Sequence, residues 1–265
     1  MKSLEGKTAI VVGASRGLGR GVTEAFLAAG AHVVGVARDP EPLAELESRE
    51  PGLTTVAADA AEPQVAERLL RESRPDVLAL VAGAQPLLRP IHQQTWESVS
   101  ANWLVDVRIT FHWLREALLL PLRPNSRVIV MSSGAAVMGS PLSGGYAGAK
   151  ATQRFLADYA AQEARRMSLG IGVTAVLPRL TPATELGRPA VLAYAERQGM
   201  SEAEYLRQLG DPVTPAIAGQ AFVELATGPQ GLTGAYILTA DGLVAVTAPG
   251  FAPQAASASD QGGHR

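Results

Sequence analysis

Tyr146 and Lys150 stand four residues apart in the chain. On a helix, this spacing places both side chains on one face, one turn from each other. A free phenol has a pKa of about 10 and holds its proton too tightly for exchange at neutral pH, whereas a nearby ammonium lowers that pKa. Tyr146 is therefore a candidate general acid or base toward a carbonyl or an alcohol. Taken alone, the same spacing also fits a solvated helix face.

Two further motifs accompany this pair. Ser133 follows the apolar run 128–131 and lies thirteen residues before Tyr146. Gly13, Gly17 and Gly19 follow the apolar run 9–12. Small residues let the backbone leave a strand tightly and approach a pyrophosphate, and a helix that begins near Gly17 offers free N–H groups and a positive dipole end. The alternative is a glycine-rich turn that binds no ligand.

Composition limits the class of protein. A chain of 265 residues, 47% of them hydrophobic, suits one α/β domain, which we place at residues 1–248. The net charge of −2 and the dispersed basic residues predict no nucleic-acid partner. The absence of cysteine and the scattered histidines predict no metal site. No signal-peptide core or membrane-length apolar run is found, so we expect a cytoplasmic protein.

Short apolar runs alternate with longer helical patterns, which predicts a doubly wound parallel sheet. Most runs are continuous rather than alternating, as expected for strands buried on both faces. The expected strands, about seven, are 8–12, 32–37, 53–58, 76–82, 127–132, 171–177 and 235–239. The expected helices are 17–29, 40–49, 62–73, 92–119, 146–168 and 213–227.

Three segments need separate interpretation. The aromatic residues of the helix expected at 92–119 are most simply explained as core or helix-packing residues: Trp96, Trp103, Phe111 and Trp113. Residues 183–212 interrupt the alternation, and Ser201 with Glu204 forms a possible capping box there. We favour a substrate lid over an ordinary surface excursion, because ligands of open α/β sheets bind beyond the carboxyl ends of the strands. Residues 249–265 have the composition of a disordered tail.

The three motifs, in this order and at these separations, resemble the short-chain dehydrogenase/reductase family over residues 5 to about 245. The resemblance implies a Rossmann-like three-layer α/β/α fold and an oxidoreductase. It also implies roles for the candidate catalytic residues. Ser133 would donate a hydrogen bond to the substrate oxygen and Tyr146 would transfer the proton. Lys150 would lower the pKa of the tyrosine and hold the nicotinamide ribose. A Ser133 that only caps local backbone is the alternative.

The resemblance further implies a nicotinamide nucleotide site. Arg16 in the glycine loop and Arg38 after the second strand mark NADP in the family, whereas an acidic residue at that strand end would favour NAD. The alternative is that both arginines only solvate loops. Asp59 matches the position that meets adenine. The implied cofactor-binding residues are Gly13, Ser15, Arg16, Gly17, Leu18, Gly19, Arg38, Asp59, Ala60, Ala82, Gly83, Tyr146, Lys150, Pro178 and Thr181.

The chain departs from the family pattern at several positions. Family spacing aligns Asp106, rather than Asn102, with a catalytic Asn that helps to hold a water linked to the lysine. Asp106 would stabilise the Lys150 ammonium and partly offset its pull on the tyrosine proton, or it would pair with a neighbour such as Arg108. Leu80 and Val81 replace two family Asn residues.

A further departure follows the sixth expected strand, where Arg179 replaces a family Gly. Arg179 is either a surface residue or a ligand of an anionic group on the substrate or cofactor. Thr184 is an alternative to Thr181 as the threonine near the carboxamide.

These observations predict an NADP-dependent oxidoreductase that interconverts a carbonyl and an alcohol on a small, apolar or mixed substrate. In the family, such a chain is a homodimer or homotetramer. The rival interpretation is a catalytically weak or inactive member that senses NADP or serves as an interaction scaffold.

Overall fold

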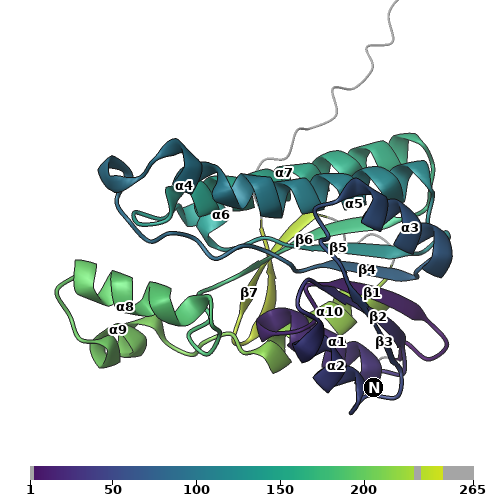
Figure 1. Cartoon of the computed structure of the whole chain (residues 1–265), viewed down its shortest axis with the longest axis horizontal. Coiled ribbons are helices and arrows are strands. Elements are labelled where there is room, and N and C mark those ends of the chain that lie inside the picture. Colours follow the sequence, from purple (N-terminus) through teal and green to yellow (C-terminus); the bar gives the residue numbers. More distant parts are fainter. Residues whose placement is uncertain (1–2, 230–233, 247–265) are drawn as a thin grey trace, which may run out of the picture.

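The computed structural model describes residues 3–229 and 234–246, which form an eight-stranded sheet between two layers of helices (Figure 1). The strands are β1 (Thr8–Val12), β2 (His32–Ala37), β3 (Leu53–Ala57), β4 (Val77–Leu80), β5 (Arg127–Met131), β6 (Gly172–Pro178), β7 (Gly234–Thr239) and β8 (Gly242–Ala245). Their order in the sheet is β3-β2-β1-β4-β5-β6-β7-β8. The first seven are parallel, which confirms the predicted doubly wound α/β fold.

The helices cover both faces of the sheet and enclose two apolar cores (Figure 1). They are α1 (Gly17–Ala28), α2 (Pro40–Glu47), α3 (Pro63–Ser73), α4 (Trp96–Asn102), α5 (Arg108–Leu119), α6 (Ala135–Met138), α7 (Gly144–Arg166), α8 (Gly187–Arg197), α9 (Glu202–Leu209) and α10 (Pro215–Thr227). One core joins α3, α5 and α7 to the sheet around the fully buried Trp113. The other joins α1, α2 and α10 around Phe26 and Phe222.

The prediction of about seven strands is one strand short. β8 pairs with β7 in the antiparallel sense, and Gly242 begins it with a φ of +116°. β8 has only four residues and is partly exposed at the sheet edge. β8 follows β7 after a two-residue turn with no helical pattern between them, which is why the alternation of strands and helices did not reveal it.

The single helix expected at 92–119 is wrong in its details. A 3₁₀ turn occupies Ile91–Gln93, and α4 begins only at Trp96 because Thr95 and Ser98 form a capping box. A π-helical turn at Trp103–Val107, labelled η2, then separates α4 from α5. Such turns are rare and occur often at functional sites, because they change the direction of the side chains they carry.

The expectation that the four aromatic residues of this region are core or helix-packing residues holds only in part. Trp113 is buried, whereas Trp96, Trp103 and Phe111 are exposed. The Trp113 indole donates to the Ala60 carbonyl at 3.0 Å and so ties α5 to the loop after β3. The three exposed aromatic side chains belong to α4, η2 and α5, and the helical pattern alone does not distinguish them from the core.

Residues 183–212 fold as α8 and α9, which Figure 1 shows beyond the end of the sheet. The predicted capping box is confirmed: Glu204 N donates to Ser201 Oγ at 3.3 Å, and Ser201 N donates to Glu204 Oε2 at 2.8 Å. The segment at 249–265, predicted to be a disordered tail, lies outside the described residues. Within residues 3–229 and 234–246, no helix is both long and apolar enough to cross a bilayer. In the same residues, no cluster of acidic and histidine side chains is arranged to hold a metal ion.

Candidate active site

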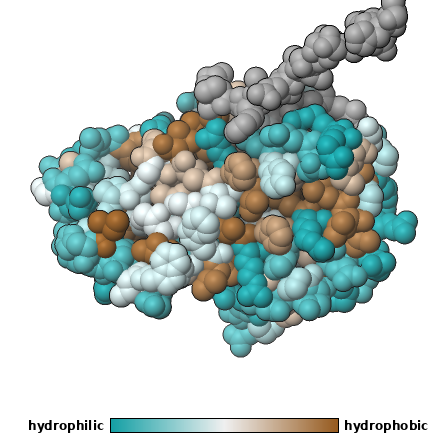
Figure 2. Space-filling view, turned by 90° about the horizontal axis from the view of Figure 1, so that it is seen from above, coloured by the Kyte–Doolittle hydropathy of each residue, from teal (hydrophilic) through white to brown (hydrophobic). Residues whose placement is uncertain are grey.

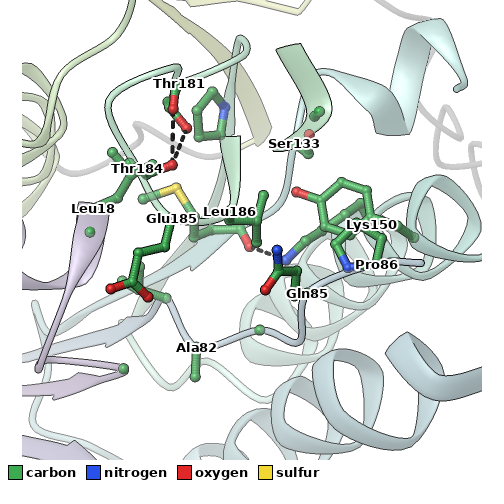
Figure 3. A pocket seen from close by; sticks show the side chains of 18 of the residues that line it. Leu18, Ala82, Gln85, Pro86, Ser133, Lys150, Thr181, Thr184, Glu185 and Leu186 are labelled. Carbon is green, nitrogen blue, oxygen red and sulfur yellow. Dashed lines mark hydrogen bonds between the residues drawn. The ribbon is translucent and has the colours of Figure 1, made fainter. Parts of the chain in front are cut away.

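A cavity of about 900 Å³ lies at the carboxyl ends of the parallel strands. It runs without interruption from the glycine loop after β1 to Tyr146 and Lys150 on α7. All of the predicted catalytic and cofactor-binding residues line this cavity except Asp106, which lies behind Lys150. In Figure 3, Leu18 and Ala82 are on one side of it and Ser133 and Lys150 on the other. Its volume is in the range of cofactor sites.

The glycine loop is packed too closely to admit side chains. Gly13 has a φ of +93°, and a Cβ there would stand 2.6 Å from the Ala82 nitrogen. A Cβ on Gly19 would stand 1.8 Å from the Gly13 carbonyl oxygen. α1 therefore begins directly against the cavity, and no side chain caps its N-terminus. These free amides and the helix dipole suit a pyrophosphate, so the residues present fit a dinucleotide.

Charged residues gather where β2 and β3 end. Arg38 is exposed, lines the cavity and forms no ion pair with any described residue. Asp39, the next residue in the chain, caps α2 by accepting from Glu41 N at 3.2 Å. Asp59 also lines the cavity, and its carboxylate accepts from Ala61 N at 2.9 Å. The end of β2 thus presents a free guanidinium to the cavity.

The second basic residue of the predicted nucleotide site forms a contact across the cavity. Arg16 Nη1 lies 2.9 Å from Glu185 Oε2, just before α8, and both side chains are largely exposed. Glu185 and Leu186 belong to the segment predicted to be a lid, and Figure 3 shows both among the residues that line the cavity. This contact joins the glycine loop to that segment.

β5 and α7 bring the three candidate catalytic residues together. Ser133 follows β5 and accepts from Ala135 N at 3.2 Å, which leaves its hydroxyl proton available to a substrate. Ser132 is buried and donates to the Lys150 carbonyl at 2.7 Å, so it ties the strand to the helix. The ammonium of Lys150 lies 5.4 Å from the centre of the Tyr146 ring.

Lys150 is a buried cation with a buried counter-ion. Its side chain is 4% exposed, and its Nζ lies 3.1 Å from Oδ2 of Asp106, which is 0% exposed. Burial acts to lower the pKa of Lys150, but the Asp106 carboxylate and the Tyr146 oxygen outweigh it and raise the pKa above its ordinary value. Asp106 Oδ1 accepts from Ala84 N at 2.7 Å. Gly83 leaves room for this carboxylate, because a Cβ there would lie 3.1 Å from Oδ2.

Asp106 does not pair with Arg108, which instead lies 3.7 Å from Glu62. The π-helical turn η2 carries Asp106 and directs it toward α7. Asn102, the other residue considered for this place, is buried and donates to the Ala84 carbonyl at 2.8 Å. Asn102 and Asp106 therefore hold the two sides of the same peptide segment after β4.

Gln153 is a buried polar residue of this region that the sequence did not reveal. Its Oε1 accepts from Lys150 Nζ at 2.8 Å. A glutamine three residues after a lysine on a helix carries no distinctive signal, because most such glutamines are solvated. The only available clue was that Gln153 lies on the same helix face as Tyr146 and Lys150.

The segment after β6 completes the cavity. Arg179 is exposed, lines the cavity and forms no ion pair with any described residue. Thr181 and Thr184 are both buried, and their hydroxyls are 3.0 Å apart (Figure 3). Tyr194 of α8 also lines the cavity, and its hydroxyl forms a hydrogen bond with Ser140. α8 and α9 thus supply one wall of the cavity.

The fold and this site define a nucleotide-binding α/β protein, and comparison with known proteins identifies the family. The family model for short chain dehydrogenases matches residues 7–193. The chain belongs to this family. A dehydrogenase/reductase from Sinorhizobium meliloti 1021 has a similar structure, with a TM-score of 0.73 and 26% sequence identity over 88% of this chain and 93% of that one.

Curated relatives match over a shorter region. L-xylulose reductase of Mesocricetus auratus is 38% identical over 105 residues, and D-erythrulose reductase of Gallus gallus is 32% identical over 110 residues. The matches cover 40% and 42% of this chain. They span 43% and 45% of the lengths of these two relatives, which is less than half of each.

Proposed function

We propose that the chain is an NADP-dependent oxidoreductase that interconverts a carbonyl and an alcohol on a small, apolar or mixed organic substrate. One observation carries the proposal: a single cavity joins an uncapped helix N-terminus, suited to a pyrophosphate, to Ser133, Tyr146 and a buried Lys150. The nicotinamide, when bound, would supply or accept the hydride. The names of the two reductases among the relatives support the same reaction class.

The residues of the chain would handle the proton and the charge. In carbonyl reduction, negative charge develops on the substrate oxygen, and preorganised donors stabilise it. Ser133 would donate a hydrogen bond to that oxygen, and the Tyr146 hydroxyl would give it a proton. The Lys150 ammonium beside the Tyr146 ring favours the negative charge left on the tyrosine oxygen. In alcohol oxidation, the same groups would act in reverse.

NADP is proposed over NAD because of the charges at the end of β2. Arg38 is free to meet a 2′-phosphate, whereas Asp39 is engaged in capping α2. The Arg38→Asp variant should weaken NADPH binding about tenfold or more, since a hydrogen bond between charged groups is worth about 1.5–3 kcal/mol. NADH binding should stay the same or improve. Unchanged NADPH affinity in this variant would show that Arg38 does not bind the phosphate.

Turnover tests the reaction class. Purified protein would be mixed with NADPH or NADH and a panel of ketones and aldehydes, beginning with L-xylulose and D-erythrulose. We expect consumption of NADPH with at least one carbonyl compound and a large loss of rate in Ser133→Ala. Nucleotide binding without turnover on any substrate would favour the second candidate function, an NADP sensor or scaffold. That candidate draws on Asp106, whose carboxylate opposes the pull of Lys150 on the tyrosine proton.

A homodimer or homotetramer is proposed from the outer surface of α5 and α7. Figure 2 looks onto this face, where hydrophobic side chains gather. Its exposed apolar residues are Phe111, Leu119, Phe155, Tyr159 and Met167. Light scattering should give the mass of a dimer or tetramer, and Tyr159→Glu should shift it toward the monomer. A monomer at all concentrations would refute this proposal. The cytoplasm remains the proposed location.

A further inference from the structure

A buried polar cluster lies behind Lys150, on the side away from the cavity. It consists of Gln153 on α7, Thr110 on α5 and the main-chain carbonyl of Asp106 in η2. Gln153 is 1% exposed and Thr110 is 0% exposed. The roles proposed above for Ser133, Tyr146 and Lys150 do not use this cluster. Buried polar groups are retained where their hydrogen bonds are satisfied, so the pattern of these bonds shows what the cluster holds in place.

Every polar atom of the Gln153 side chain has a partner. Its Nε2 donates to Thr110 Oγ1 at 2.6 Å and to the Asp106 carbonyl at 3.1 Å. These two bonds use both N–H groups of the amide. Its Oε1 accepts from Lys150 Nζ at 2.8 Å. The amide therefore links the lysine to the π-helical turn that carries its counter-ion.

The neighbours permit only one orientation of this amide. The Thr110 hydroxyl donates to the Asp106 carbonyl at 2.9 Å, so its proton is already used and its oxygen accepts from Gln153. A flipped amide would turn its oxygen toward two acceptors and its N–H groups toward an ammonium. In that orientation, the amide oxygen would have no donor to accept from, and the amide N–H groups would have no acceptor. Thr110 thus fixes the direction in which Gln153 Oε1 points.

Gln153 Oε1 is the nearest neutral partner of the Lys150 ammonium. The other protein oxygens near Nζ are Asp106 Oδ2 at 3.1 Å and the Met131 carbonyl at 3.5 Å. Coulomb attraction alone would draw a buried ammonium closer to the carboxylate. The hydrogen bond to Gln153, at 2.8 Å the shortest of these three contacts, competes with the carboxylate for the ammonium, whose Nζ lies 5.4 Å from the Tyr146 ring centre.

We propose that Gln153 is a positioning residue for Lys150. Its amide, anchored by Thr110 and by the Asp106 carbonyl, holds the ammonium between the Asp106 carboxylate and Tyr146. The role rests on the proposed function insofar as Lys150 serves proton transfer at Tyr146. The competing explanation is that Gln153 only ties α7 to α5, because two of its bonds cross between these helices.

Two variants of Gln153 separate these explanations. Gln153→Met keeps the volume but removes all three bonds. Gln153→Glu keeps an oxygen toward Lys150 but loses the amide donors to Thr110 and to the Asp106 carbonyl. A purely structural tie is lost in both variants. A positioning role is lost only in the methionine variant, because in the glutamate variant the attraction between the new carboxylate and the ammonium offsets the loss of the two anchoring bonds.

The chain contains only three lysines, Lys2, Lys7 and Lys150, so lysine-selective ¹⁵N labelling gives a simple NMR spectrum. The readout is the rate at which the Lys150 ammonium exchanges its protons with water. We expect slow exchange in the wild type and in Gln153→Glu. In Gln153→Met, exchange should be about tenfold faster, because a hydrogen bond to a charged group is lost. The turnover of Gln153→Met should fall by about tenfold, as for other partners that orient a site residue.

Two further variants, Thr152→Val and Thr110→Val, complete the test. Thr152→Val removes a helix hydroxyl on α7 that bonds only to Gly148, and it should leave Lys150 exchange and turnover unchanged. If Gln153→Met does not fold, Thr110→Val serves as the test variant. It removes the hydrogen bond between Thr110 and the Gln153 amide, and it should speed proton exchange at Lys150 about threefold.

Equal exchange in the wild type, Gln153→Met and Thr110→Val would overturn the proposal, as would equal acceleration in the methionine and glutamate variants. The NMR readout needs no substrate. Absence of wild-type turnover would therefore refute the proposed function and leave the test of Gln153 intact.

Discussion

Two ion pairs border the same cavity, and they differ in burial rather than in distance. Arg16 and Glu185 approach to 2.9 Å with side chains that are 69% and 76% exposed. Lys150 and Asp106 approach to 3.1 Å with side chains that are 4% and 0% exposed. Solvent screens the outer pair, which makes it nearly neutral for stability. The inner pair has no such screening, so removal of either partner leaves an uncompensated buried charge.

The two pairs also differ in their surroundings. The inner pair is fixed by the Ala84 amide, Gln153 and the π-helical turn η2. The outer pair joins two surface segments, the glycine loop and the residues before α8, and both of its side chains reach solvent. A shorter ion pair is therefore not a stronger one. The inner pair is held in place beside Tyr146, whereas the outer pair can separate at little cost in stability.

The largest expected effect is a loss of turnover when the Tyr146 hydroxyl beside the inner pair is removed. Tyr146→Phe removes the proposed acid and base but keeps the ring beside Lys150. Turnover should fall by about 10²–10⁴-fold, the range for general acid–base catalysis. Nucleotide affinity should change little, and a fluorescence titration checks it in the same preparation. Near wild-type turnover would remove Tyr146 from the mechanism.

Removing the carboxylate of the inner pair should mainly affect the stability of the fold. Asp106→Asn leaves Lys150 as an unpaired buried cation and should lower the free energy of unfolding by about 3 kcal/mol, measured by urea denaturation. Turnover should stay the same or rise, because the carboxylate no longer offsets the pull of Lys150 on Tyr146. A collapse of turnover in a folded variant would show instead that the reaction requires the carboxylate.

The stability from the inner pair should depend on pH in one direction. The pKa of Lys150 is raised above 10.5 in the folded chain, because the Asp106 and Tyr146 contributions outweigh burial. A raised pKa means that the pair stabilises the folded state fully below pH 10.5 and loses this effect as pH rises through the folded pKa. The difference in unfolding free energy between wild type and Asp106→Asn should therefore be largest near neutral pH and shrink as the solution becomes alkaline. If the difference in unfolding free energy grew as pH rises, the expected direction of the pH dependence would be wrong.

The smallest effect should come from the outer pair. Glu185→Gln removes the charge opposite Arg16 with little change in shape. The free energy of unfolding should change by less than about 1 kcal/mol, as for other exposed pairs. The Kd for NADPH should stay within about threefold of the wild-type value, which corresponds to less than about 1 kcal/mol of binding free energy. A loss of stability as large as that of Asp106→Asn would abolish the distinction between the two pairs.

The parallel strands and the cavity residues were predictable for physical reasons. Strands buried on both faces have continuous apolar sequences, and the central strands β1, β4, β5 and β6 appear as such runs. Close backbone packing requires glycine, so Gly13 and Gly19 marked the loop. These features depend on local sequence, which is why the pattern was sufficient.

The features that were missed depend on tertiary contacts. The π-helical turn η2 has no sequence signature, yet it directs Asp106 toward Lys150. Trp96 and Trp113 look alike in a helical pattern, but only Trp113 finds a buried acceptor, at Ala60. Gln153 is significant only because Thr110 on another helix orients it. None of these partners is near in sequence to the residue it affects.

A nucleotide titration tests the central claim, that the cavity is an NADP site in front of a reactive tyrosine. Purified protein would be titrated with NADPH and, in parallel, with NADH, and binding followed by fluorescence. We expect clear NADPH binding, much weaker NADH binding and loss of that preference in Arg38→Asp. Binding of neither nucleotide would refute this claim, because the glycine loop, Arg38 and Lys150 would then have no common ligand.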